Sequence, residues 1–139
     1  MISEVDDATK EHARSFGYGI GMAFQIVDDV LDLTGQMTTV GKPVASDLRQ
    51  GLITLPTLYY LDVAPDDPAL GLIRNGLTPV STDIDRLVDS IRNSGAIERS
   101  MQDASNYVES ALQSLSVLPK SPYRDALQAL AFYIVDREL

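Results

Sequence analysis

Three aspartates, Asp28, Asp29 and Asp32, stand close together within an otherwise apolar run of the chain. At 3.6 residues per turn they share one side of a helix, and Gln25 falls on the same side one turn earlier. Carboxylates removed from water without a partner are strongly destabilising, so a cation is expected beside them. Oxygen ligands without His or Cys suit hard divalent ions, above all Mg²⁺ that also binds waters and phosphate oxygens. The pattern therefore predicts a magnesium site.

Apolar residues line both flanks of this predicted helix, which favours a buried helix over a charged surface helix. They are Ile20, Phe24, Val27 and Leu31 on one flank and Ile26, Val30 and Leu33 on the other. A calcium loop of the EF-hand type is disfavoured, because the alternating Asp-x-Asp-x-Asp-Gly pattern and its distant Glu are absent from the sequence. We expect the polar stripe to face an interior cavity.

A loop is predicted after the aspartates, because Gly41 and Pro43 cannot continue the helix. Lys42 lies between them and would cover a metal-bound phosphate as a point charge, excluding water as the loop closes. The alternative for Lys42 is a solvated loop lysine.

This part of the sequence resembles the second aspartate-rich motif and the following loop of the trans-polyprenyl diphosphate synthases. The matching segments are residues 24–32, Gly41-Lys42, residues 46–51 and Thr54-Leu55-Pro56. The resemblance extends from about Glu11 through residues 95–98 to the carboxyl end. It implies an all-α chain, with residues 1–139 as a single helical unit that carries the carboxyl-terminal helices of the isoprenoid synthase fold.

The activity that the resemblance implies is a Mg²⁺-dependent prenyl transfer, in which isopentenyl diphosphate adds to the cation formed from an allylic diphosphate. Asp28, Asp29 and Asp32 match the family's metal-binding triplet. No side chain of this sequence is assigned a separate catalytic role.

The resemblance also assigns substrate contacts. Gln25 matches a glutamine that contacts substrate in the same cavity, and Lys42 matches the diphosphate-binding lysine of the loop. Asp47 matches a loop aspartate that supports the metal and the lysine. Phe24, on the cavity side of the helix, would touch the prenyl chain.

The sequence departs from the family pattern in two ways. Many members carry a lysine directly after the loop glycine, where this chain has Leu52, so Arg49 is a possible substitute phosphate contact. Family members are also much longer, and their first aspartate-rich motif has no counterpart here, since Asp6 and Asp7 fit solvent-facing charges at a helix end. Two interpretations stay open: a portion of a prenyltransferase, or a catalytically incomplete fragment or accessory subunit that binds Mg²⁺-diphosphate or a partner half.

Composition limits the partners. The net charge of -9 disfavours nucleic acid and anionic membranes, so a phosphate ligand would need local cations. The absence of Cys excludes disulfides and thiolate metal sites. No signal peptide and no long uncharged apolar run is present, which predicts no stable membrane insertion and a cytoplasmic protein.

Periodicity and breaker residues predict a series of helices and no strand. Residues from about 4 to 16 are expected to form a polar helix or the end of one. The further expected helices cover about 17–35, 53–62, 69–75, 82–94 and 96–116, with a last helix beginning at Pro122 after the N-cap Ser121. Gly17 and Gly21 are expected to accept the close approach of a neighbouring helix, because a helix-interior Gly costs about 1 kcal/mol relative to Ala and needs a compensating contact.

A chain that carries only part of the fold is expected to expose apolar surface around Phe24, Val27 and Leu31. Apolar area left in water costs roughly 25 cal/mol per Å². We therefore predict that the isolated chain forms a homodimer or higher oligomer, or binds a partner half, and that light scattering at micromolar concentration detects the homo-oligomer. A compact, cooperatively unfolding monomer would contradict the homo-oligomer.

Overall fold

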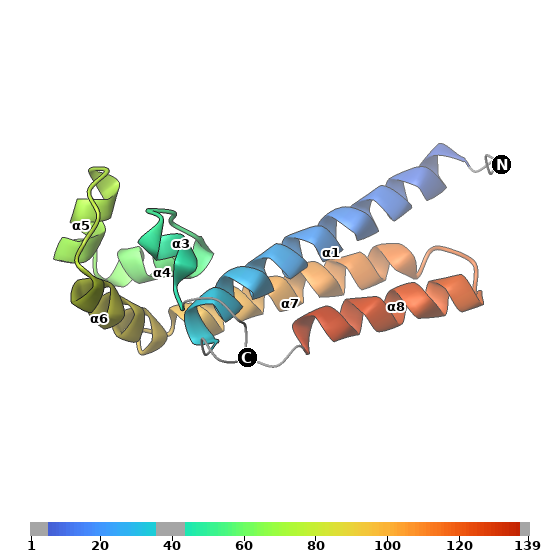
Figure 1. Cartoon of the computed structure of the whole chain (residues 1–139). Helices are drawn as coiled ribbons and strands as arrows, with labels where there is room; N and C mark the ends of the chain where they lie inside the picture. The colour runs from blue at the N-terminus through green and yellow to red at the C-terminus, as the bar shows by residue number, and fades with distance from the viewer. Residues whose placement is uncertain (1–5, 36–43, 137–139) are drawn as a thin grey trace. The chain divides into compact units, whose positions relative to one another are not determined.

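The computed structural model describes residues 6–35 and 44–136, and within these ranges it contains helices and no strand (Figure 1). The helices are α1 (Asp7–Thr34), α3 (Ser46–Arg49), α4 (Leu55–Val63), α5 (Pro68–Arg74), α6 (Ser81–Arg92), α7 (Ala96–Leu115) and α8 (Pro122–Val135). The prediction of an all-α chain is confirmed. None of the described helices is long and apolar enough to cross a membrane.

The predicted helix positions hold for α4 to α8, where the local signals are strong. Pro56 lies in the first turn of α4, as expected. At the start of α8, Ser121 is the N-cap before Pro122, and its side chain accepts a hydrogen bond from the N–H of Arg124. The predicted division of the amino-terminal helix near residue 16 was wrong, because residues 7–34 form the single helix α1. The short helix α3 was not predicted.

Asp6 caps the start of α1. Its Oδ1 accepts the N–H of Thr9 at 2.6 Å. This hydrogen bond lowers the pKa of Asp6, because it stabilises the ionised carboxylate at the positive end of the helix. Both Asp6 and Asp7 are exposed, which agrees with their interpretation as charges at a helix end.

The contacts divide the described chain into two compact units, whereas the sequence favours a single one. Unit 1 contains residues 6–27 and 102–136, and unit 2 contains residues 28–35 and 44–101. Helices α1 and α7 each run from one unit into the other. The assignment of 1–139 as a single functional unit stays a prediction.

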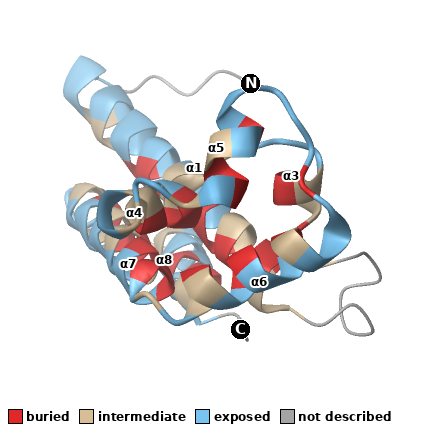
Figure 2. Cartoon of the chain, turned by 90° about the vertical axis from the view of Figure 1, so that its left-hand side faces the viewer, coloured by how far each residue is buried: buried red, intermediate tan, exposed pale blue. Residues whose placement is uncertain are grey.

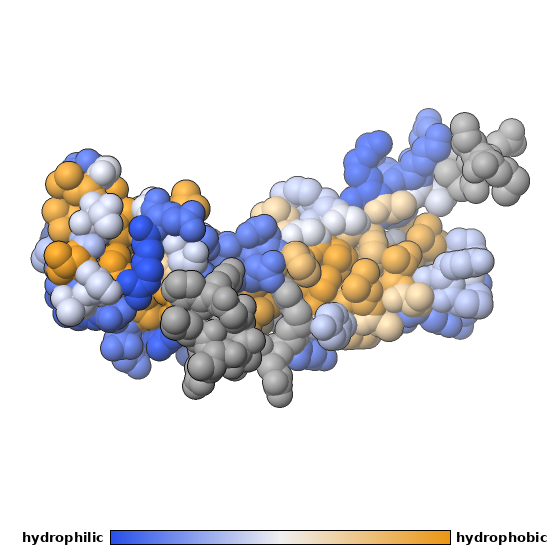
Figure 3. All heavy atoms as spheres, in the orientation of Figure 1, coloured by the Kyte–Doolittle hydropathy of each residue, from blue (hydrophilic) through white to orange (hydrophobic). Residues whose placement is uncertain are grey.

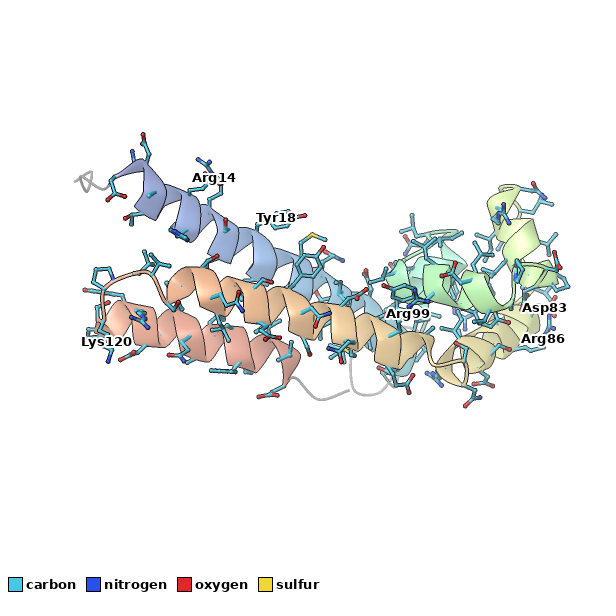
Figure 4. The ribbon with its side chains drawn as sticks, turned by 180° about the vertical axis from the view of Figure 1, so that it is seen from behind. Arg14, Tyr18, Asp83, Arg86, Arg99 and Lys120 are labelled. Carbon is cyan, nitrogen blue, oxygen red and sulfur yellow. The ribbon has the colours of Figure 1, made fainter. Side chains whose placement is uncertain are left out.

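Unit 1 is built from the first part of α1, most of α7, and α8. The rings of Tyr18 on α1 and Tyr107 on α7 meet edge to face, with centroids 6.3 Å apart. Figure 4 labels Tyr18 and Arg14, which line a groove of about 400 Å³ between the two helices. The Arg124 guanidinium of α8 donates to the carbonyl of Leu118 in the connection from α7.

The glycine that permits close packing in unit 1 is Gly19, which corrects the assignment to Gly17 and Gly21. A Cβ at Gly19 would lie 2.9 Å from the carbonyl oxygen of Tyr107 and 3.1 Å from Cβ of Ala111. A Cβ at Gly17 or Gly21 would have no atom within 4 Å. Only at Gly19 does the contact between α1 and α7 depend on the missing side chain.

Unit 2 has a hydrophobic core contributed by the end of α1, α3 to α6 and the start of α7. Val30 and Leu33 of α1 pack with Leu48, Leu70 and residues of α6 such as Ile91. Figure 2 colours the buried residues red. At the rim of the unit, the Arg99 guanidinium lies 3.9 Å from the ring centre of Tyr59 and 3.4 Å from a carboxylate oxygen of Asp62 (Figure 4).

The packing at Gly19 gives a first prediction. Gly19→Ala should lower the free energy of unfolding by about 1–3 kcal/mol, because the neighbour at 2.9 Å is backbone and the helices must move apart. Gly17→Ala and Gly21→Ala should instead raise it by about 0.5–1 kcal/mol, because Ala is the better helix former and has space there. Urea unfolding of the three variants measures the difference. Equal effects at all three positions would contradict the close contact.

The Tyr60 hydroxyl gives a second prediction. It is buried and donates to Oδ2 of Asp67 at 2.6 Å, while Oδ1 of Asp67 caps α5 by accepting the N–H of Ala69. Burial, and then the hydrogen bond to Asp67, raises the pKa of Tyr60 above its usual value of 10.0. The folded state therefore holds this proton more tightly than the unfolded state does. The resulting stability is complete below the unfolded pKa and is lost as the pH rises through the folded pKa.

We expect the free energy of unfolding of the chain to fall above about pH 10, with a shallower fall in Tyr60→Phe. At pH 8 the same variant should be less stable by about 1 kcal/mol, because its hydrogen bond to Asp67 is lost. Urea midpoints between pH 8 and pH 11 measure both effects, and Tyr133→Phe, at an exposed position, is the control. Parallel alkaline losses in the wild type and Tyr60→Phe would refute the role of Tyr60.

Candidate functional site

The three aspartates of the motif occupy the last turns of α1, within unit 2, and their environments differ. Asp28 and Asp29 are half-buried, whereas Asp32 is only 6% exposed. The sequence pattern treats the three as equivalent members of one stripe. The structure separates Asp32 from the other two.

Asp32 is hydrogen-bonded to the start of α3. Its Oδ1 accepts the N–H of Ser46 at 3.1 Å, and its Oδ2 accepts the N–H of Asp47 at 3.2 Å. Its main-chain oxygen accepts the N–H of Ala45 at 2.8 Å. We call these three contacts the Asp32 anchor. Contrary to the expected cavity-facing stripe, both oxygens of this carboxylate point to backbone amides.

Ala45, at the start of α3, explains why an outside carboxylate is needed. Ala45 is the N-cap of α3, so its side chain offers no oxygen to the first amides of that helix. It is fully buried and adopts a left-handed conformation with φ 60° and ψ 40°. For a residue other than Gly this conformation costs roughly 1–2 kcal/mol, which the surrounding contacts must offset.

Arg49 links α3 to α6. Its Nε donates to the carbonyl of Val44 at 3.0 Å, Nη1 to the hydroxyl of Ser81 at 3.3 Å, and Nη2 to Oδ1 of Asp85 at 2.7 Å. Because all three guanidinium nitrogens bind groups of unit 2, the structure gives no support to Arg49 as the substitute phosphate contact. Leu52, which stands where the family carries a lysine, is exposed.

Arg92 of α6 stabilises the end of α1. Its Nε donates to the main-chain oxygen of Leu33 at 2.6 Å, and carbonyls in the last turn of a helix have no partner within the helix. Val44, Arg49, Asp85, Val88, Asp89 and Arg92 line a cavity of about 240 Å³ beside these contacts. The guanidinium of Arg92 also lies 3.8 Å from a carboxylate oxygen of Asp89, so the positive charges at this cavity are matched by carboxylates.

The carboxylate oxygens of Asp28, Asp29 and Asp32 are the candidate ligands for a divalent ion. Among residues 6–35 and 44–136, no three His, Cys, Asp or Glu side chains converge as a complete metal site. Mg²⁺ needs fewer protein ligands than that, because it is usually bound by one or two carboxylates together with waters and substrate phosphates. Asp28 and Asp29 fit such a partial site, and Asp32 is engaged by the anchor.

The remaining predicted site residues fall in different places. Asp47 lies on the first turn of α3, and its N–H is one of the donors of the Asp32 anchor. Phe24 and Gln25 belong to unit 1 and are both exposed. Lys42 lies outside the described residues. The roles predicted for these four residues stay predictions.

Sequence reasoning missed the structural role of Asp32, although one signal pointed to it. Asp32 lies two residues before the end of α1, where the helix dipole disfavours a negative charge. An aspartate at that position needs hydrogen-bond donors from elsewhere in the chain.

The helices and the aspartate motif are those of an isoprenoid synthase, and the comparison with known families agrees. The family model of polyprenyl synthetases matches residues 1–88. The chain belongs to the polyprenyl synthetase family.

The similar proteins extend the match over nearly the whole chain. The chain is 40% identical over 138 residues to heptaprenyl diphosphate synthase component 2 of Bacillus subtilis (strain 168), a match that covers 99% of this chain and 39% of that protein. The crystal structure of heptaprenyl diphosphate synthase from Staphylococcus aureus superposes with a TM-score of 0.88 at 34% identity, covering 99% of this chain and 43% of that one.

A third similar protein is a polyprenyl synthase from Caulobacter crescentus, whose crystal structure is a complex with calcium and isoprenyl diphosphate. It superposes with a TM-score of 0.83 at 31% identity, covering 97% of this chain and 42% of that one. The predicted family and fold are confirmed. The chain spans about two fifths of the length of these three proteins.

Proposed function

We propose that this chain supplies the carboxyl-terminal, diphosphate-binding portion of a polyprenyl diphosphate synthase. The complete enzyme would transfer an allylic prenyl group to isopentenyl diphosphate. The observation that carries the proposal is the placement of Asp28 and Asp29 on the last turns of α1, next to the α3 segment that bears Asp47, in a chain of this family.

Magnesium is the cofactor of this proposal, held by Asp28 and Asp29. When bound, the ion would neutralise charge on the diphosphate and so favour its departure from the allylic carbon. The net charge of -9 supports the need for such an ion, because diphosphate is itself an anion. The calcium and isoprenyl diphosphate in the Caulobacter crescentus complex are chemically related to this pair.

The other predicted contacts complete the proposal. Gln25 and Lys42 would bind substrate, and Phe24 would touch the prenyl chain. Asp47 would support the metal and its diphosphate. In this proposal the substrates are an allylic diphosphate and isopentenyl diphosphate. The proposed location of the protein is the cytoplasm.

A second candidate is an accessory or incomplete subunit that binds Mg²⁺-diphosphate, or a partner half, without chemistry of its own. It is favoured by the share of the relatives that the chain covers and by the word "component" in the name of the Bacillus subtilis relative. Exposed apolar side chains in unit 1 fit such a partner or a second copy of the chain: Tyr18, Phe24, Val117, Tyr123, Leu127, Leu130, Phe132 and Tyr133. The expected exposure is wrong for Val27, which is fully buried. Figure 3 shows hydrophobic atoms gathered on one face of this unit. Incorporation of radiolabelled isopentenyl diphosphate by the isolated chain would decide for the enzyme.

The metal assignment gives a prediction for Asp28. Mg²⁺ should bind weakly alone and more tightly with inorganic diphosphate, because the ion keeps waters and binds phosphate oxygens. Asp28→Asn should weaken the coupled binding by at least about tenfold, since it removes a carboxylate ligand. Calorimetry measures the affinity, and Asp66→Asn, which removes one charge from an exposed turn of unit 2, is the control. Equal affinities of Asp28→Asn and wild type would remove Asp28 from the site.

A further inference from the structure

We infer that Asp32 is a positioning residue that fixes the start of α3, and that the metal-binding oxygens of the motif come from Asp28 and Asp29 alone. The metal part of this inference rests on the proposed function. The anchor part rests only on contacts within unit 2.

The first argument is the occupancy of the carboxylate. Each carboxylate oxygen of Asp32 accepts one backbone N–H, and the residue is 6% exposed, which leaves little room for an ion that keeps its waters. Moving this carboxylate to a metal would leave the amides of Ser46 and Asp47 without their acceptor. These two amides are part-buried, so the loss of their acceptor would destabilise the start of α3.

The second argument is the pairing of two helix ends. The first amides of α3 have no acceptor within that helix, and the N-cap Ala45 has no side-chain oxygen to offer. At the end of α1, a negative charge is disfavoured by the dipole of α1 itself. The Asp32 anchor resolves both problems at once, because the charge meets the amino-terminal amides of another helix.

The third argument concerns what the anchor orients. The hydrogen bond from its N–H to Asp32 fixes the backbone position of Asp47. The main-chain oxygen of Asp47 accepts the N–H of Leu52 at 2.8 Å. The loss of Asp32 would therefore shift Asp47 without removing any oxygen of Asp28 or Asp29. Asp32 acts on the site through Asp47.

Amide hydrogen exchange by NMR on the full chain tests the anchor. In Asp32→Ala the amides of Ser46 and Asp47 should exchange at least about tenfold faster than in the wild type, because charge-assisted hydrogen bonds are lost. Asp32→Asn, which keeps one oxygen acceptor, should recover part of the protection. Asp28→Asn is the matched control on the same helix and should leave these two amides unchanged. The amide of Ile91 in the core of unit 2 reports whether each variant is folded.

Titration of the wild-type chain with Mg²⁺ and inorganic diphosphate tests the metal part without any substitution. If Asp32 is a positioning residue, the hydrogen-exchange rates of the Ser46 and Asp47 amides stay low when Mg²⁺ and diphosphate bind, while the resonances of Asp28 and Asp29 shift. Faster exchange of those amides on binding would show that the carboxylate has moved to the metal, and would overturn the inference.

Equal exchange in Asp32→Ala and the wild type would overturn the anchor itself. If the wild type binds no Mg²⁺-diphosphate at all, the proposed function fails, and the exchange rates of the variants still decide the role of Asp32.

Discussion

The arrangement of unit 2 depends on one electrostatic constraint, which is the placement of acidic residues in the last turns of α1. The dipole of a helix disfavours negative charge at its carboxyl end, and the last carbonyls there also lack partners. Donors from elsewhere in the chain must satisfy both needs. Backbone amides of α3 bind the carboxylate of Asp32, and Arg92 of α6 binds the carbonyl of Leu33. The end of α1 is therefore a point to which α3 and α6 are both attached.

Helix α6 holds this junction from two sides. Its apolar residues Ile84, Leu87, Val88 and Ile91 join the core that contains Val30 and Leu33 of α1. Its polar side binds Arg49 through Ser81 and Asp85, and so fixes α3. The ion pair of Arg49 is partly exposed and contributes modestly by its charge alone. Its three hydrogen bonds fix the direction of the guanidinium, and thereby the distance between α3 and α6.

The sequence was sufficient for the helices whose ends carry strong local signals, and insufficient where partners distant in the chain decide. Ser121-Pro122 defined the start of α8, and the aspartate motif indicated the family. Helix α3 has only four residues, too few for any periodicity to appear. Gly17, Gly19 and Gly21 share one helix and one residue type, and only the position of Tyr107 and Ala111 makes Gly19 the close contact. Spacing likewise grouped Asp32 with Asp28 and Asp29 on one side of the helix. The helical period contains no information on which of the three carboxylates binds backbone amides.

The division of the motif follows from the different demands of binding an ion and of holding the start of a neighbouring helix. A carboxylate that binds Mg²⁺ must keep oxygens accessible to a hydrated ion and to a phosphate that arrives with it. A carboxylate that holds backbone must be buried, because water would otherwise compete for the same amides. One side chain meets both demands poorly, whereas adjacent turns of one helix can meet them separately. The half-buried Asp28 and Asp29 suit the first demand, and Asp32, which is 6% exposed and bound to two amides, suits the second. Aspartates that share a helical face can thus be chemically identical and still act differently, according to what the neighbouring helices place against each of them.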